Sequence, residues 1–218
     1  MEPISGRSHL DEVIISLGCD CHPAYLLKRL DLHRVSMPFD WLSTDAIHGI
    51  KYVYDNIRTD FSYFLRDLKK DKDGLVYSAF YECSRFFHHE DILYNKKTYD
   101  AFERRARRFM SYLERSDCLF LYNVTSYAMD SQESVMTFYN SLIEFKRVLK
   151  SKDRLLVYIR YDESTEENAK YCMLLAELTA QLDNIRMAHY VRHTNQYGIW
   201  GDETAYYSLL RDLDVYKL

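Results

Sequence analysis

Three short apolar runs, each followed by polar residues, stand out along the chain. They are residues 13–17 (VIISL), 118–124 (CLFLYNV) and 155–161 (LLVYIRY), and the first ends at Gly18. Runs of this length that are rich in β-branched and aromatic side chains are typical of buried strands. Residues 185–191 show a similar composition, so we expect a fourth strand there.

Between these runs, apolar residues recur at every third or fourth position, as they do on one face of a helix. The clearest case is the segment 99–113, where Phe102, Ala106, Phe109 and Leu113 share one face. The same spacing predicts a helix that begins near His22 and ends at about Leu30, and further helices over residues 44–69, 131–149, 166–182 and 202–213.

The predicted order is therefore β-α, a mixed middle part, and then β-α-β-α-β-α. Strands that alternate with helices of this length pair in parallel and place helices on both faces of the sheet. We predict an α/β fold of three layers with a mostly parallel open sheet. The chain has 218 residues but only 6 glycines and 3 prolines, which favours a single α/β domain over residues 1–218. Residues 70–98, with shorter extended segments, are expected to form an insertion or a lid.

Composition and charge narrow the class of protein. A net charge of -4 gives no basic footprint for nucleic acid. No apolar run approaches the roughly 18 residues of a membrane span. The N-terminal sequence is polar and the number of cysteines is odd, at 5, which favours free thiols in a reducing, cytoplasmic compartment. We expect a small-molecule or peptide substrate as the partner, and the 20 tyrosines are compatible with a homodimer.

Cofactor motifs are absent from the sequence. Neither G-x-G-x-x-G nor G-x-x-x-x-G-K-[ST] occurs, and there is no G-x-S-x-G nucleophile motif. Cys19 and Cys21 form a C-x-C pair without a second Cys or His pair nearby, which makes a poor zinc site. We therefore expect no metal and no other cofactor.

In open parallel sheets, ligands bind outside the carboxyl ends of the strands. If the predicted strands are parallel, the polar residues that follow them converge on one edge of the sheet. These residues are Cys19, Asp20, Cys21 and His22, then Asn123, Thr125 and Ser126, then Asp162 and Glu163, and finally Arg192, His193 and Asn195.

Cys21 is the strongest candidate for chemistry among these residues. It lies in the turn between a strand and a helix, where Asp20 can cap the helix and Pro23 suits its first turn. Backbone N–H groups and the helix dipole favour a thiolate there, whereas the Asp20 carboxylate opposes it. A small buried thiol that only packs is the alternative. A nucleophilic cysteine needs a base, and the candidates are His22, His88, His89, His189 and His193.

A run of arginines, Arg104, Arg105, Arg107 and Arg108, lies in the predicted helix over residues 99–113. Arginines can bind phosphate or another anion. The more common interpretation of such a run is the solvated face of an amphipathic helix.

Two motifs carry a resemblance to a known family. The pattern S-L-G-x-x-C-x-x-A-x-x-L covers residues 16–27, and P-F-D-W covers residues 38–41. Together they resemble a family described as putative papain-like cysteine peptidases, a domain of otherwise unknown function. Looser matches are F-x-H-E at residues 87–90, the arginine-rich helix with Arg105 and Phe109, and W-G-D at residues 200–202.

The resemblance implies that Cys21, and not Cys19, is the nucleophile and that His89 is its base, with Asp202 or Asp40 orienting the histidine. It also implies an α+β papain-like fold as the alternative to the α/β fold predicted above. A strand, a glycine, a nucleophile and a helix also resemble the start of SGNH-class esterases, with cysteine in place of serine, and His193 would then be the base. The expected ligand-binding residues are Gly18, Cys19, Asp20, Asp40, Trp41, Asn123 and Arg105.

The leading hypothesis is a cysteine-dependent hydrolase or acyl transferase. Cys21 would attack a carbonyl, a histidine (His89 first, His193 second) would take the proton, and helix N–H groups near Cys21 would stabilise the oxyanion. One alternative is a non-catalytic binding module for an anionic ligand, such as a nucleotide sugar or a glycan phosphate. Others are an SGNH-like esterase and a structural protein with an inert, buried Cys21.

Overall fold

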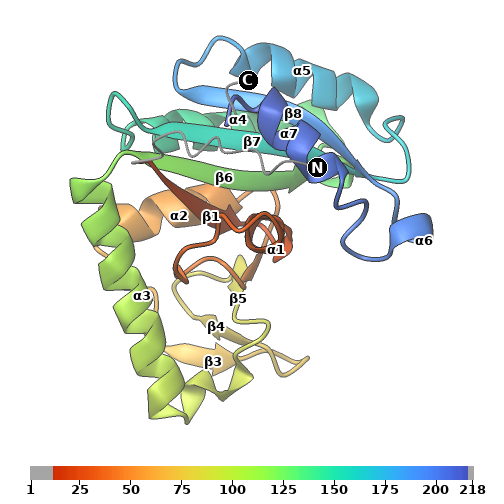
Figure 1. The fold of residues 1–218 in the computed structure, drawn as a ribbon. Coiled ribbons are helices and arrows are strands. Elements are labelled where there is room, and N and C mark those ends of the chain that lie inside the picture. The colour runs from red at the N-terminus through yellow and green to blue at the C-terminus, as the bar shows by residue number, and fades with distance from the viewer. Residues whose placement is uncertain (1–11, 216–218) are drawn as a thin grey trace, which may run out of the picture.

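The computed structural model of the chain describes residues 12–215, and a four-stranded sheet lies at its centre (Figure 1). The strand order is β1-β6-β7-β8, and every neighbouring pair is parallel. The strands are β1 (Val13–Gly18), β6 (Cys118–Thr125), β7 (Arg154–Asp162) and β8 (Ile185–Arg192). Each agrees with a predicted strand to within one residue at either end.

Helices cover both faces of this sheet, which confirms the predicted α/β class. On one face, leucines of two helices pack against Leu119, Leu121 and Leu156 of the strands. On the other face, a larger set of helices packs against Ile15, Phe120 and Val157. The first face carries α1 (His22–Arg29) and α7 (Ala205–Asp212), and the second carries α2 (Gly49–Arg58), α3 (Lys96–Arg115), α4 (Gln132–Lys146) and α5 (Ala169–Thr179).

The middle part of the chain forms two small antiparallel pairs outside the central sheet. They lie below β1 and beside α3 in Figure 1, and Phe86 joins them to the aromatic core through Phe64 and Phe102. The pairs are β2 (Ser43–Thr44) with β5 (Ser84–Arg85) and β3 (Leu68–Lys70) with β4 (Val76–Ser78). Three short helical segments complete the description: η1 (Glu90–Leu93), η2 (Ser126–Ala128) and α6 (Thr194–Tyr197).

The long helix predicted over residues 44–69 is wrong at its C-terminal end, because α2 stops at Arg58. Asp60 and Phe61 both have positive φ angles, 47° and 57°, which a right-handed helix does not allow. The chain turns there so that Phe64 enters the core next to Phe39, with ring centroids 6.0 Å apart. Tertiary packing of aromatic side chains therefore overrides the local helical spacing.

The turn after β1 delivers Cys21 to the edge of the sheet. Gly18 has a φ of +78°, and a Cβ atom there would lie 3.1 Å from the carbonyl oxygen of Phe39. A side chain is thus disfavoured both by the backbone angle and by the close approach of the P-F-D-W loop. The register between β1 and β6 shifts between Ser16 and Gly18, which bends the chain toward α1.

From residue 12 to residue 215, no helix has both the length and the apolar character needed to cross a membrane.

Candidate active site

The Cys21 thiol lies against an imidazole from a distant part of the chain. Cys21 occupies the position just before α1, and its Sγ atom is 3.3 Å from Nε2 of His88, which lies between β5 and η1. The His88 ring is flanked edge-on by Trp41 and Phe87, with centroid distances of 6.4 and 5.0 Å. The two partners are 67 positions apart in the sequence, so local sequence patterns cannot predict this contact.

A cavity of about 320 Å³ opens beside the Cys21–His88 pair. Its walls come from α1, from the segment that holds His88 and from the loop before α7. The lining residues are Asp20, Cys21, His22, Ser43, Phe87, His88, Arg160, Arg192, Ile199 and Trp200. This volume is at the low end for small-molecule sites, so only a small group of a substrate fits inside.

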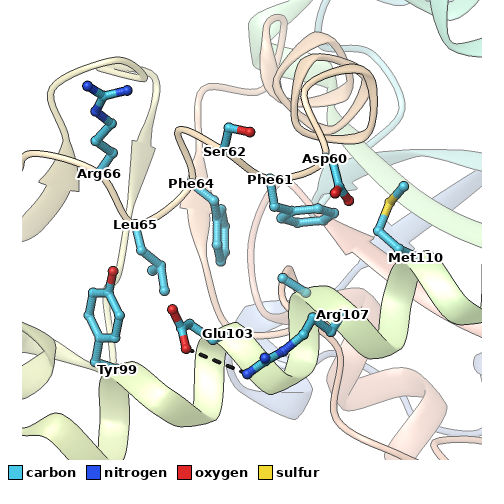
Figure 2. Close-up of a pocket in the computed structure, with 11 residues that line it drawn as sticks. Asp60, Phe61, Ser62, Phe64, Leu65, Arg66, Tyr99, Glu103, Arg107 and Met110 are labelled. Atoms are coloured by element: carbon cyan, nitrogen blue, oxygen red, sulfur yellow. Dashed lines mark ion pairs between the residues drawn. The ribbon is translucent and has the colours of Figure 1, made fainter.

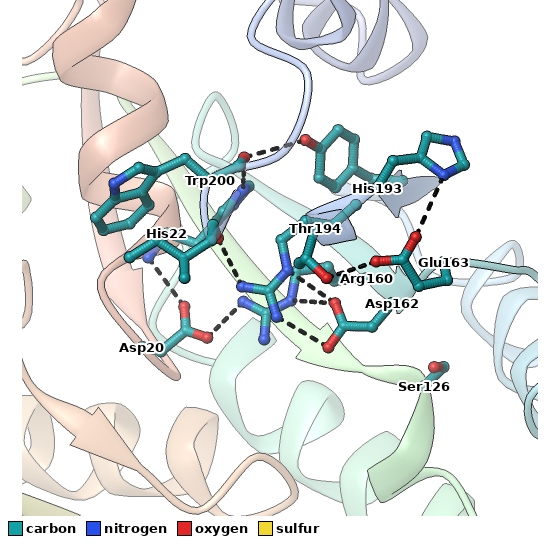
Figure 3. A network of polar contacts seen from close by, with 12 residues as sticks. Asp20, His22, Ser126, Arg160, Asp162, Glu163, His193, Thr194 and Trp200 are labelled. Carbon is teal, nitrogen blue, oxygen red and sulfur yellow. Dashed lines mark hydrogen bonds and ion pairs between the residues drawn. The ribbon is translucent and has the colours of Figure 1, made fainter. Parts of the chain in front are cut away.

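Asp20 connects the ends of three strands beneath this cavity. Its Oδ1 atom accepts hydrogen bonds from the backbone N–H of His22 at 2.9 Å and from the Asn123 amide at 3.2 Å. Its Oδ2 atom accepts a hydrogen bond from Nη1 of Arg160 at 2.5 Å. Figure 3 shows Arg160 between Asp20 and Asp162. The Arg160 charge holds the pKa of Asp20 below its usual range despite burial.

His22, next to Cys21 in sequence, points away from the thiol and into the protein. Its side chain is 1% exposed, with Nδ1 2.6 Å from the Tyr158 hydroxyl and Nε2 3.2 Å from the Trp200 carbonyl oxygen. A carbonyl oxygen only accepts, so Nε2 carries the proton and Nδ1 accepts from Tyr158. Burial and the Arg160 charge lower the pKa of His22 to about 4. His22 is thus a neutral histidine that ties α1 to the loop at Trp200.

The Cys21 thiol is protonated at neutral pH in the resting protein. Burial, and then the Asp20 carboxylate, raise its pKa to about 11. His22 uses its backbone N–H on Asp20, and Pro23 has none. Neither of these two residues can therefore donate a backbone hydrogen bond to an oxyanion.

His89, the base that the family resemblance implies, lies elsewhere. Its ring packs edge-on against Phe102, 4.9 Å between centroids, and its Nε2 atom is buried without a hydrogen-bond partner. Burial, followed by the charge of Arg105, lowers the pKa of His89. The structure brings His88, and not His89, to the thiol, because residues 86–89 form a tight turn, closed by a hydrogen bond from the His89 N–H to the Phe86 carbonyl at 3.0 Å, in which the two side chains point in different directions.

Asp202 and His193, expected as catalytic residues, line a different cavity of about 300 Å³ between β8 and α7. Asp202 accepts hydrogen bonds from the backbone and the hydroxyl of Thr204, at 2.9 and 2.7 Å. His193 lies 4.0 Å from Glu163 and points away from Asp20 and Arg160 in Figure 3. Neither residue lines the cavity beside Cys21.

The expected ligand-binding residues lie in different places relative to the cavity. Asp20 lines the cavity, and Asn123 supports it from below with an Oδ1 atom 3.4 Å from the Cys19 N–H. Cys19 is itself buried, and Gly18 shapes the turn. Trp41 contacts His88 rather than the cavity. Asp40, within the P-F-D-W loop, accepts hydrogen bonds from His33 and Met37, and Arg105 covers the Phe102 ring.

Sequence reasoning missed Arg160, which lies on the cavity floor with a side chain 5% exposed. One feature of the sequence could have indicated it: Arg160 is a charged residue in the otherwise apolar run LLVYIRY, close to the carboxyl end of a strand. Arg192 and Trp200 were noted for other reasons, and the structure adds both to the same wall.

A larger cavity, of about 440 Å³, lies away from Cys21. It is formed by α3 and the segment from Asp60 to Arg66, with the Glu103–Arg107 ion pair at its rim (Figure 2). It holds no cysteine or histidine. Among residues 12–215, no three His, Cys, Asp or Glu side chains are grouped so that they could hold a metal ion.

Comparisons with known proteins add to this geometry. Over 46 residues the chain is 44% identical to the uncharacterized protein R408 of Acanthamoeba polyphaga mimivirus, a match that covers 21% of this chain and 21% of that protein. The chain thus spans about a fifth of that relative's length. No solved structure is significantly similar. A known family matches residues 12–189. Because this match covers most of the sequence, the chain belongs to the family described as "putative papain-like cysteine peptidase".

Proposed function

We propose that the protein is a cysteine-dependent hydrolase of the acyl-transfer type, with Cys21 as the nucleophile and His88 as its general base. The observation that carries this proposal is the 3.3 Å contact between Cys21 Sγ and His88 Nε2 beside a cavity that both residues line. A nucleophile and a base within such reach are the minimum that thiol catalysis requires. Membership in a family described as cysteine peptidases supports the same chemistry.

The chemistry begins from a neutral thiol and a neutral imidazole. As Cys21 Sγ bonds to the carbonyl carbon, its proton passes to His88 Nε2 and the carbonyl electron pair moves to oxygen. When that electron pair returns, the bond to the leaving group breaks, and His88 gives the proton to the departing nitrogen or oxygen. Water then attacks the thioester with His88 again as the base, and Cys21 is released as a thiol.

The raised pKa of Cys21 makes His88 more important in this scheme. At neutral pH a thiol with a pKa of about 11 is almost entirely protonated. A base that takes the proton during the attack therefore contributes to the rate directly, typically by a factor of roughly 10² to 10⁴. Trp41 and Phe87, on either side of His88, restrict the orientation of the ring.

Site-resolved alkylation with iodoacetamide, measured by mass spectrometry on the native protein at pH 7, tests the proposal. Cys83 is a matched control thiol in the same molecule, because it is also half-buried and burial raises its pKa to about 11 as well. We expect Cys21 to react at least about tenfold faster than Cys83, since only Cys21 has a base in contact. His88→Gln should remove the difference, and His89→Gln should preserve it.

Turnover is then screened with a panel of p-nitrophenyl esters and peptide amides, with acyl adducts on Cys21 detected by mass spectrometry. Cys21→Ser and Cys21→Ala should abolish adducts and turnover, whereas Cys19→Ala should not. Equal alkylation of Cys21 and Cys83, or a rate at Cys21 that is indifferent to His88→Gln, would contradict the assignment of this pair.

A further inference from the structure

Arg160 is a charged side chain that the proposed mechanism does not use. It projects from β7 on the face that carries α1, it is 5% exposed, and it lines the same cavity as Cys21. A buried guanidinium is costly unless each of its N–H groups has a partner. The partners of Arg160 account for only part of its donors.

One edge of the Arg160 guanidinium makes no hydrogen bond within the described residues. Nη1 donates to Asp20, but Nε is buried without a hydrogen-bond partner, and its nearest carboxylate oxygen, on Asp162, is 3.7 Å away. No hydrogen bond from Nη2 is present among residues 12–215. Nε and Nη2 together form the side of a guanidinium that binds a carboxylate with two parallel hydrogen bonds.

Arg192, which lines the same cavity as Arg160, shows the same edge in use. Its Nε and Nη2 atoms each lie 2.8 Å from an oxygen of Asp162, and Nη1 donates to the Ile199 carbonyl at 2.9 Å. Arg192 and Asp162 therefore satisfy one another. Asp20 is satisfied in turn by Arg160, Asn123 and the His22 N–H. The Nε and Nη2 edge of Arg160, whose only carboxylate neighbour within the described residues is Asp162 at 3.7 Å, is the part of this network that still lacks a hydrogen-bond acceptor.

We propose that this edge of Arg160 binds a carboxylate of the substrate, so that the enzyme acts on amides or esters that carry a carboxylate close to the carbonyl that is attacked. The inference rests on the proposed function of Cys21. Cys21 and Arg160 line one cavity of about 320 Å³, so the carboxylate and the reacting carbonyl lie within a few bonds of each other. Phe87, Ile199 and Trp200 at the rim provide apolar contacts for the rest of the substrate.

Two alkylating agents that differ only in charge test the inference. Iodoacetate carries a carboxylate one carbon from the reacting centre, and iodoacetamide is its neutral counterpart. Both alkylate the same sulfur, so the effects of that cysteine's pKa and of its base cancel in the ratio of the two rates. We expect the iodoacetate-to-iodoacetamide ratio at Cys21 to exceed the ratio at Cys83 by about tenfold, as one charge-assisted hydrogen bond would give. Arg160→Gln should lower it to the Cys83 value.

Matched variants isolate the contribution of Arg160 to this ratio. Arg154→Gln, at the opposite end of β7, should leave the ratio unchanged. His88→Gln should also leave the ratio high, which excludes an imidazolium as the source of the preference. Arg160→Gln leaves Asp20 buried without its counter-charge and can unfold the protein. The double variant Asp20→Asn/Arg160→Gln removes both charges together and gives the same test.

A second measurement does not depend on the reactivity of Cys21. Saturation-transfer NMR should show phenylacetate, but not phenylacetamide, bound to the Cys21→Ala protein, and binding should disappear when Arg160→Gln is added. If Cys21 is alkylated readily but its ratio equals that of Cys83, the inference is overturned while the proposed nucleophile stands. If Cys21 resists alkylation until the protein unfolds, the proposed function fails, and phenylacetate binding then decides the role of Arg160 separately. Absence of binding in that case overturns the inference too.

Discussion

Protonation of His22 is expected to destabilise the fold, although His22 takes no part in the proposed chemistry. The ring is 1% exposed and uses both nitrogens, Nε2 toward the Trp200 carbonyl and Nδ1 toward the Tyr158 hydroxyl. A proton on Nδ1 would face that hydroxyl, which would then have to turn its own hydrogen elsewhere. It would also place a second positive charge near Arg160, whose field already opposes it.

The magnitude follows from the pKa of His22, which falls from an ordinary 6.5 to about 4 in the folded protein. A tenfold change in a protonation equilibrium corresponds to about 1.4 kcal/mol, so the folded state loses about 3 kcal/mol relative to the unfolded state once His22 is charged in both. The sign is set by the depressed pKa, because the unfolded chain binds the proton first. Stability is therefore full above pH 6.5, falls as the pH drops from 6.5 to 4, and levels off below pH 4 as far as His22 is concerned.

Urea unfolding at a series of pH values between about 4 and 7 measures this loss, with His22→Asn as the test variant and His193→Asn as an exposed control. We expect the wild-type protein and His193→Asn to lose about 3 kcal/mol more than His22→Asn over this interval. An NMR titration of the ring Cε1–H signals assigns the pKa directly, even where His22→Asn folds poorly. Titration of His22 near its ordinary pKa, or parallel stability curves for all three proteins, would refute this reasoning.

Two further predictions concern the loops that hold the site together. Gly201 has a φ of +74°, and a Cβ atom there would lie 2.5 Å from the Tyr190 hydroxyl, whereas Gly198 has a φ of +77° and open space around it. Gly201→Ala should therefore destabilise the protein by about 1 to 3 kcal/mol in urea unfolding. The loss should exceed that of Gly198→Ala, which introduces only backbone strain. Equal losses in the two variants would contradict the close approach of Gly201 to Tyr190. Asp40→Asn should lower the pKa of His33, which the hydrogen bond to Asp40 raises, and should cost more stability at about pH 5 than at about pH 8, because the charged His33 loses its partner. An unchanged NMR titration of His33 in this variant would contradict the pairing.

The sheet could be predicted from the sequence because the chain itself carries the signal. β1, β6 and β7 are short, mostly apolar runs, and parallel strands buried on both faces require such runs. The edge strand β8 carries a weaker signal, because Arg186 and His189 are exposed. The prediction of a helix over residues 44–69 is wrong beyond Arg58, where contacts with distant parts of the chain determine the backbone conformation. Phe64 fits the helical spacing, yet it belongs to a cluster with Phe39 and Phe86 that closes only in three dimensions.

The candidate site, like the fold, could be predicted from the sequence only where local patterns determine it. Cys21, Asp20 and Asn123 lie within a turn or at a strand end, so parallel pairing alone places them together. The partner of Cys21 could not be chosen in this way, because His88 and His89 are adjacent and both come from a segment outside the sheet. Which of them faces the thiol depends on the orientation of a turn that begins at the buried Phe86. Arg160 was missed because the sequence shows only a single charged residue in an apolar strand. Nothing in the sequence indicates which groups this side chain contacts.

Asp20 links the structural and chemical roles of this edge of the sheet. Its carboxylate accepts hydrogen bonds from the start of α1, from β6 and from β7, and so fixes the position of the turn that holds Cys21. The same charge raises the pKa of Cys21. A thiolate waiting in this turn would have to overcome both Asp20 and burial, and the positive charge of Arg160 is already engaged with Asp20. The arrangement therefore favours a thiol that reacts only while its proton is being transferred, which makes reactivity depend on His88 and on an electrophile held against the sulfur. A cysteine built in this way is less readily oxidised than one that rests as a thiolate.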